Sequence, residues 1–148
     1  MEIRIAEKED IGAIAALEAA CFSAVASEET LERLRTDPGC VLLGAREGAE
    51  LLGSVWFQCV LDEGYVGNLA VWPAHRRRGI GRALVEAMLD KAWARGLSFL
   101  TLEVREGNLP ARSLYRSYGF EEVGLRKNCY ERPRENAVLM TAYPGKEG

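Results

Sequence analysis

The sequence predicts an α/β (α+β) fold, with helices flanking a mixed, mostly antiparallel central sheet. Strand patterns dominate as far as Val71, and helix and strand patterns alternate after it. The chain has 148 residues, 48% of them hydrophobic and 28% charged, which is ordinary for a globular protein with a buried core. We therefore expect one domain that spans residues 1–148.

The N-terminal part of the chain is expected to hold four strands and two helices. Asp10 is a candidate cap for a helix whose apolar residues share one face. Ser27 opens a second helix that runs to about Leu34. The expected strands are 2–5, 40–46, 51–60 and 65–71, and the expected turns lie at 37–39, 47–50 and 62–64.

The C-terminal part is expected to hold two helices and three strands. The first helix carries a buried apolar stripe and ends at Gly96. The second is capped by Asn108, has Pro110 in its first turn and ends at Gly119. The expected strands are 98–104, 120–125 and 137–143, and the stripe consists of Leu84, Val85, Met88, Leu89, Ala92 and Trp93.

Charge and cysteine usage exclude several classes of protein. The formal net charge of -3 argues against a general nucleic-acid binder, and the basic residues are concentrated at 76–82 and 126–134. Four scattered cysteines and one histidine predict neither a zinc site nor a disulfide framework, so no metal is expected. No apolar run approaches the ~20 residues that span a bilayer, and nothing resembles a signal peptide. We expect a cytoplasmic protein without membrane or nucleic-acid partners.

The run from Arg76 to Gly81 lies between a predicted strand and a predicted helix, which is the context of a phosphate-binding loop. Glycines allow a tight turn and a close ligand, and a helix N-terminus presents unpaired N–H groups with a positive dipole end. The loop lacks the Gly-Lys-Ser/Thr ending of a Walker motif, and Leu84 stands where a dinucleotide fingerprint needs its third glycine. Its pattern predicts an anion site for a phosphate or pyrophosphate, although the arginines alone would also suit a solvated loop.

This loop and the segments around it resemble the GNAT superfamily of N-acetyltransferases over nearly the whole chain. Arg-x-x-Gly-x-Gly after a strand is similar to the acyl-CoA pyrophosphate loop of that superfamily. The matching segments are Asn68-Leu69-Ala70-Val71-x-Pro, Leu102-Glu103-Val104-Arg105-x-x-Asn108 and Leu114-Tyr115-x-x-x-Gly119-Phe120. The tail from Arg126 to Met140 most resembles the RimI-type branch, which acetylates the N-terminal alanine of a small-subunit ribosomal protein.

The resemblance implies a binding site for acetyl-CoA as cosubstrate. The strand that precedes the loop would hydrogen-bond the peptide-like pantetheine arm, and the amide of Val71 would polarise the thioester carbonyl. Asn108 would contact CoA, although its role as a helix cap explains it equally well. The residues implied in donor binding are Leu69, Ala70, Val71, Arg76, Arg77, Arg78, Gly79, Ile80, Gly81, Arg82, Ala83 and Asn108.

Two residues are implied as catalysts of direct acetyl transfer in a ternary complex. Glu103 interrupts an apolar strand, and the family places a general base there, acting through water on an amine whose pKa is ~8 for an α-amino group. Tyr115 would be the general acid at the leaving sulfur. From the pattern alone, Glu103 also suits a strand-edge ion pair and Tyr115 a core aromatic. His75 is expected on the phosphate side or the surface.

The acceptor is less well specified than the donor. Phe22, Arg126, Tyr130 and Glu135 are candidates for holding a protein N-terminus. RimI-type enzymes commonly carry a Pro-Trp pair directly after the residue that corresponds to Phe22, and this chain lacks that pair. They also carry two tyrosines where this chain has Cys129-Tyr130. The sequence therefore does not specify which peptide is the acceptor. A lysine side chain or a small-molecule amine is the alternative acceptor, and a non-catalytic CoA-binding module is the alternative of another class.

Overall fold

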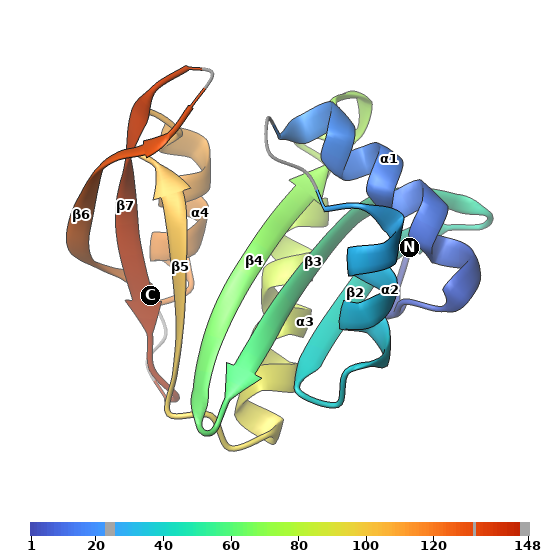
Figure 1. The fold of residues 1–148 in the computed structure, drawn as a ribbon, viewed down its shortest axis with the longest axis horizontal. Helices are drawn as coiled ribbons and strands as arrows, with labels where there is room; N and C mark the ends of the chain where they lie inside the picture. Colours follow the sequence, from blue (N-terminus) through green and yellow to red (C-terminus); the bar gives the residue numbers. More distant parts are fainter. Residues whose placement is uncertain (23–25, 132, 146–148) are drawn as a thin grey trace.

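The computed structural model describes residues 1–22, 26–131 and 133–145, and within them seven strands form one sheet (Figure 1). The strand order is β1-β2-β3-β4-β5-β7-β6. The strands are β1 (Glu2–Ile5), β2 (Cys40–Glu47), β3 (Glu50–Val60), β4 (Glu63–Val71), β5 (Phe99–Arg105), β6 (Glu121–Tyr130) and β7 (Glu135–Ala142). The helices are α1 (Ile11–Cys21), α2 (Glu28–Thr36), α3 (Ile80–Ala94) and α4 (Leu109–Ser117), with short 3-10 turns η1 (Lys8–Asp10) and η2 (Pro73–His75).

Neighbouring strands are antiparallel except β4 and β5, which are parallel. Helix α3 connects this parallel pair, as the crossover of a βαβ unit requires a helix on one face of the sheet. Helices α1 and α2 lie on the other face (Figure 1). The predicted fold class, a mixed and mostly antiparallel sheet flanked by helices, is confirmed.

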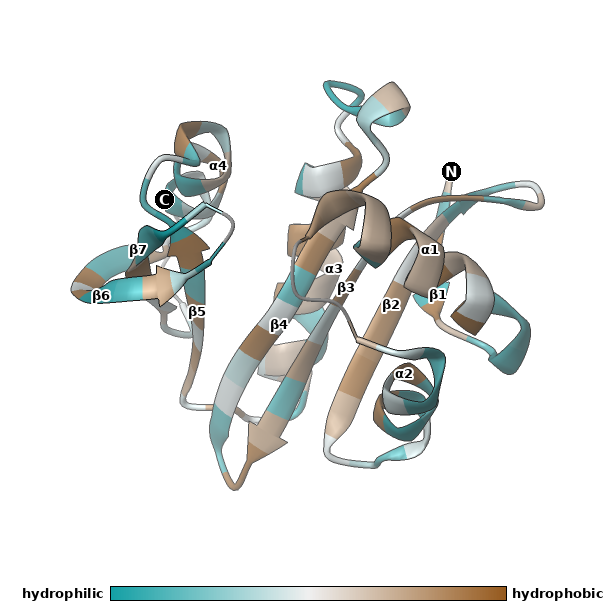
Figure 2. Ribbon diagram, turned by 45° about the horizontal axis from the view of Figure 1, so that its top comes forward, coloured by the Kyte–Doolittle hydropathy of each residue, from teal (hydrophilic) through white to brown (hydrophobic). Residues whose placement is uncertain are grey.

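The two faces of the sheet carry two separate apolar clusters. On one face, Leu84 and Met88 of α3 and Phe120 pack against β2, β3, β5 and β7. On the other face, Ile14 and Leu17 of α1 pack with Leu31 of α2 against β2 and β3. Because β2 is covered on both faces, its first six residues, 40–45, are apolar without alternation, and Figure 2 shows β2 and α1 mainly in brown.

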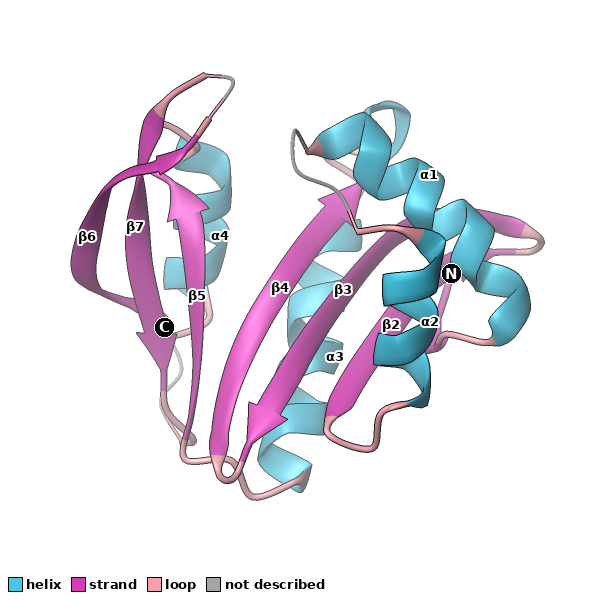
Figure 3. Ribbon diagram, in the orientation of Figure 1, coloured by secondary structure: helices cyan, strands magenta, loops and turns pink. Residues whose placement is uncertain are grey.

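The sheet separates between β4 and β5. These strands pair only over Glu63–Tyr65 and Phe99–Thr101, and beyond that they diverge, as Figure 3 shows. The register of β3 against β4 shifts between Val55 and Phe57, where Trp56 opposes two residues of β4, Gly67 and Asn68. This β-bulge bends β4, since an extra residue in one strand locally breaks the ladder and increases the twist.

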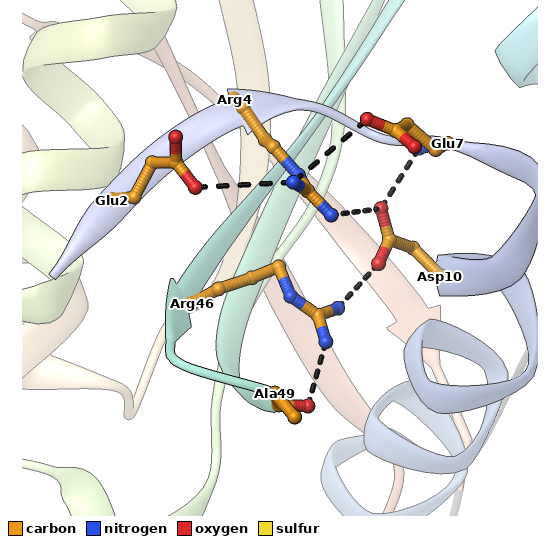
Figure 4. A network of polar contacts seen from close by, with 6 residues as sticks. All are labelled: Glu2, Arg4, Glu7, Asp10, Arg46 and Ala49. Carbon is orange, nitrogen blue, oxygen red and sulfur yellow. Dashed lines mark hydrogen bonds and ion pairs between the residues drawn. The ribbon is translucent and has the colours of Figure 1, made fainter.

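Asp10 stands at the N-cap of α1, as predicted, but its side chain does not make the capping hydrogen bond to the helix. It is buried, and its carboxylate accepts a hydrogen bond from the amide of Glu7 at 2.8 Å, inside the 3-10 turn that precedes the helix. Arg46 and Arg4 form ion pairs with the same carboxylate, and Arg46 also donates to the carbonyl of Ala49 at 2.6 Å (Figure 4). The network joins β1, η1 and the β2–β3 hairpin.

Several element boundaries differ from the predictions. Strand β4 begins at Glu63, so the preceding turn lies at 61–62, with Leu61 at φ 56°. Strand β6 continues to Tyr130 instead of ending at 125, because it pairs with β7 at the exposed edge of the sheet, where apolar alternation is not required. The caps at Ser27 and Asn108 are confirmed, since Oγ of Ser27 accepts from the amide of Thr30 and Oδ1 of Asn108 from that of Ala111. None of the described helices is long and apolar enough to cross a membrane.

Replacement of Gly67 by alanine is expected to destabilise the fold, because a Cβ there would lie 2.1 Å from the indole of Trp56. We expect the free energy of unfolding to fall by about 1–3 kcal/mol, the usual effect of overpacking. Urea denaturation measures it. Gly12→Ala is the control: Gly12 lies in the first turn of α1, its Cβ would meet nothing closer than 3.8 Å, and the substitution should leave stability unchanged or raise it by up to about 0.5 kcal/mol. Equal stability of the Gly67 variant and wild type would contradict the bulge geometry.

Candidate active site

A cavity of about 600 Å³ opens where β4 and β5 diverge. Its wall includes Phe22, which follows α1 on one face of the sheet, and Tyr115 of α4 on the other face, so the cavity reaches through the gap between the strands. The lining residues are Cys21, Phe22, Tyr65, Val66, Gly67, Asn68, Leu69, Thr101, Leu102, Glu103, Val104, Arg105, Asn108, Ala111, Tyr115, Arg126, Tyr130 and Leu139.

Glu103 projects from β5 into this cavity with both carboxylate oxygens held. Oε1 accepts from Nη1 of Arg126 at 2.6 Å, and Oε2 accepts from the thiol of Cys129 at 3.3 Å. The side chain remains 36% exposed, so water reaches it. Burial, and then the hydrogen bond to Glu103, raise the pKa of the Cys129 thiol. The thiol therefore keeps its proton and acts as a donor to the carboxylate.

Tyr115 lines the same cavity as Glu103 but comes from helix α4. It is 7% exposed, and its ring packs edge to face against Phe120 with centroids 5.5 Å apart. Loss of water around the phenol, and secondarily the neighbouring Tyr130, raise the pKa of Tyr115 well above its usual range. The phenol consequently holds its proton throughout the physiological pH range.

Arg105, two residues after Glu103 on the same face of β5, organises the hairpin between β6 and β7. Its guanidinium donates to the carbonyls of Pro133 and Glu131 at 2.9 and 3.1 Å, and it pairs with Glu135 at 3.2 Å. It also lies 4.5 Å from the ring centroid of Tyr130. Burial, followed by the electrostatic influence of the neighbouring Cys129 and Glu103, raises the pKa of Tyr130 to about 12. Arg105 thus fixes the hairpin residues that border the cavity.

The glycine loop turns into α3 at Gly79, which has φ 79° and stands at the N-cap. Its left-handed backbone is the conformation that glycine adopts without steric cost. The amides of the first helical turn have no intrahelical acceptor, so they are available to an anion. Arg82, in that turn, lies 5.4 Å from the ring centroid of Tyr118, which places the helix start beside α4.

Two of the loop arginines bind neighbouring protein groups. Arg76 donates to the carbonyl of Val71 at 3.3 Å, and Arg78 pairs with Glu47 at 3.3 Å. Arg78 also contacts Nδ1 of His75 at 2.8 Å, and Nε2 of His75 contacts Glu50 at 3.0 Å. Because a guanidinium can only donate, Nδ1 of His75 accepts from Arg78, and the N–H at Nε2 donates to the Glu50 carboxylate. The loop is therefore tied to the β2–β3 hairpin.

The structure brings together both residues predicted as catalysts and most of those predicted to hold the acceptor. Glu135 lies outside the cavity wall, where it accepts from the amide of Gly107 at 2.6 Å and pairs with Arg105. The predicted residues on the wall are Phe22, Leu69, Glu103, Asn108, Tyr115, Arg126 and Tyr130. Those outside it are Ala70 and Ile80, which are buried in the two apolar clusters, and Val71, Arg76, Arg77, Arg78, Gly79, Gly81, Arg82 and Ala83 at the strand end and helix start.

Sequence reasoning missed a polar cluster beside the cavity. Glu18 of α1 is fully buried and accepts hydrogen bonds from Nδ2 of Asn68 at 2.9 Å and from Nε1 of Trp56 at 3.3 Å. The position of Glu18 in the helical periodicity of α1 could have indicated that it is buried. Glu18 follows Ile11 by seven residues and Ile14 by four, so it lies on the apolar stripe of α1.

Comparison with known proteins identifies the class of protein. The acetyltransferase (GNAT) family matches residues 11–120 of this chain, which therefore belongs to the GNAT family. The resemblance drawn from the sequence motifs is confirmed.

Within this family, the chain is similar to enzymes that acetylate a ribosomal protein. The chain is 46% identical over 89 residues to the [ribosomal protein bS18]-alanine N-acetyltransferase of Haemophilus ducreyi, covering 58% of this chain and 61% of the relative. The enzyme of that name from Escherichia coli K12 is 46% identical over 85 residues, 56% of this chain and 57% of the relative. These alignments therefore span less than two thirds of the curated relatives. The crystal structure of the Escherichia coli ribosomal-protein-S18-alanine N-acetyltransferase superimposes with a TM-score of 0.89 at 32% identity, covering 99% of this chain and 96% of that one.

Replacement of Arg105 by lysine is expected to loosen the β6–β7 hairpin. Lysine cannot donate to two carbonyls and a carboxylate in the fork geometry of arginine. We expect a loss of about 1–3 kcal/mol in the free energy of unfolding, because backbone acceptors lose their donors. Urea denaturation, with Arg33→Lys on the exposed side of α2 as the control, measures the effect. Equal stability of the two variants would mean that Arg105 does not hold the hairpin.

Proposed function

We propose that this protein transfers an acetyl group from acetyl-CoA to the α-amino group of a protein N-terminus, by direct attack in a ternary complex. The observation that carries the proposal is that Glu103 and Tyr115, from β5 and α4, line one cavity beside the unpaired edge of β4. The carboxylate is reached by water and the phenol is kept protonated, as a general base and a general acid require.

The donor would bind along β4 and at the start of α3. Trp72 donates its amide to Leu52 of β3, so by the alternation of a strand the amide of Val71 points away from β3 and toward the gap. That amide would polarise the thioester carbonyl, and Leu69 would pair with the pantetheine arm. The free amides of the first turn of α3, with Arg77 and Arg82 nearby, would bind the pyrophosphate.

The proton path of the proposed reaction begins at the acceptor amine. Glu103 would accept a proton from the amine through water, and the free amine would attack the thioester carbonyl carbon. Collapse of the tetrahedral species breaks the carbon–sulfur bond, and Tyr115 would donate its proton to the departing sulfur. The extra proton on the new amide nitrogen would return through water to the Tyr115 phenolate, and the proton held by Glu103 would pass to solvent. The products are the acetylated N-terminus and the free thiol of CoA, and no acyl-enzyme is formed.

The relatives support an N-terminal alanine of ribosomal protein bS18 as the acceptor, since that is the substrate in the names of the Haemophilus and Escherichia enzymes. The chemistry agrees with an α-amine, whose pKa of ~8 demands less of the base than the ~10.4 of lysine. Phe22, Arg126 and Tyr130 border the cavity on the side of α1 and the β6–β7 hairpin, where a peptide would enter.

An acceptor panel tests the proposal. Purified protein and acetyl-CoA are assayed for thiol release with peptides that begin with alanine, serine, glycine or methionine, with N-blocked lysine peptides and with polyamines. We expect release with free N-termini, highest with the alanine N-terminus of bS18. Release with lysine or polyamines alone would overturn the N-terminal assignment. Acetyl-CoA binding without release from any acceptor would overturn the enzymatic one.

Replacement of Glu103 by glutamine is expected to lower kcat by about 100-fold or more, because the water-linked base is lost while the shape is kept. The KM for acetyl-CoA should stay within about twofold, since Glu103 would act on the amine and not on the donor. Steady-state kinetics with the alanine peptide measures both. Glu29→Gln, on the exposed first turn of α2, is the matched control with wild-type kinetics. A parallel loss of acetyl-CoA affinity in the Glu103 variant would make that residue structural.

A further inference from the structure

Glu18 is a fully buried carboxyl group that the proposed proton path does not use. It lies on the inner face of α1, and its acceptor oxygens face side-chain groups that can only donate hydrogen bonds. Both of its oxygens accept, and Nδ2 of Asn68 and Nε1 of Trp56 can only donate. A buried carboxylate whose two oxygens each accept a hydrogen bond favours one arrangement of its two donors.

The two donors stand on either side of the β-bulge that bends β4. Trp56 is the β3 residue that opposes two residues of β4, and Asn68 is one of those two. The other is Gly67, over which the indole of Trp56 lies so closely that no side chain fits. Glu18 therefore links both strands of the bulge to helix α1, and Asn68 is itself on the cavity wall.

We infer that Glu18 is a positioning residue for acetyl transfer, holding the β4 backbone at Gly67–Leu69 in the bent conformation that receives the acetyl donor. The inference rests on the proposed function. Glu18 acts through Asn68 and Trp56 and does not itself contact the reacting atoms. Its effect should fall on kcat, because a small displacement of the strand moves the thioester carbonyl away from the amine and from Tyr115.

The substitution Glu18→Gln tests this inference. The glutamine amide would face two donors with only one acceptor oxygen, so one of the two hydrogen bonds must break. We expect kcat to fall about 10- to 100-fold, the usual effect of a displacement of about 1 Å at a reacting centre, with a smaller change in the KM for the peptide. Trp56→Phe, which keeps an aromatic ring over Gly67 and removes one donor, should lower kcat in the same direction.

A double variant that exchanges the donor and acceptor groups of residues 18 and 68 tests whether the lost activity can be restored. With Glu18→Gln and Asn68→Asp together, the glutamine amide can donate to the new carboxylate while its oxygen accepts from Trp56. We expect the double variant to recover most of the kcat lost in Glu18→Gln. A double variant no faster than Glu18→Gln would overturn the inference.

Asp10→Asn is the matched control, because Asp10 is, among the residues that the structure describes, the other buried carboxyl beside α1, and its network lies at β1 and the β2–β3 hairpin (Figure 4). It should lower the Tm and leave kcat unchanged at a temperature where all variants are folded. An equal loss of kcat in Asp10→Asn, or a wild-type kcat in Glu18→Gln, would overturn the inference. An inactive wild-type protein would instead overturn the proposed function, and the inference with it.

Discussion

The separation of β4 from β5 is the constraint on which the rest of the structure depends. The two strands share a parallel ladder of three residues each and then part, so the facing edges lose their partners. An unpaired strand edge inside a protein exposes hydrogen-bonding groups that must be satisfied by something else. Here the opening forms a cavity of about 600 Å³ lined from both faces of the sheet. A peptide-like molecule can complete the edge of β4 as an added strand would.

The two sides of the opening are held by different polar groups. On the β4 side, the buried carboxyl of Glu18 joins Asn68 and Trp56 around the bulge. On the β5 side, Arg105 ties the hairpin between β6 and β7 to the strand that carries Glu103. Neither group belongs to the proton path of the proposed reaction. Both hold the walls in place, which suits a site whose reacting groups come from elements distant in sequence.

Not all arginines of the glycine loop are available to bind an anion. Arg76 and Arg78 bind the carbonyl of Val71 and the carboxylate of Glu47, so two arginines hold the loop against the end of β4 and the β2–β3 hairpin. The backbone amides at the start of α3 keep their donors available, since a helix cannot satisfy its first N–H groups internally. The proposed pyrophosphate site thus combines these backbone donors with the nearby side chains of Arg77 and Arg82.

The sequence by itself determined the fold class, the order of the elements, the helix caps at Ser27 and Asn108 and the glycine loop. These features depend on local periodicity and on single residue types, which a short window of sequence contains. It also placed the chain in the GNAT family through motifs spread along its length. The roles of Glu103 and Tyr115 remain proposals that follow from those motifs and from the placement of both residues on one cavity.

Tertiary structure alone decided where polar side chains find partners across the sheet. Asp10 has the sequence context of a helix cap, but its carboxylate serves the turn before the helix and two arginines from β1 and β2. Glu18 lies on the apolar stripe of α1, which indicates burial but does not name its partners. Its donors lie 38 and 50 residues further along the chain. Such pairings depend on strand register and on a bulge, which arise from contacts between distant segments and leave no local pattern in the sequence.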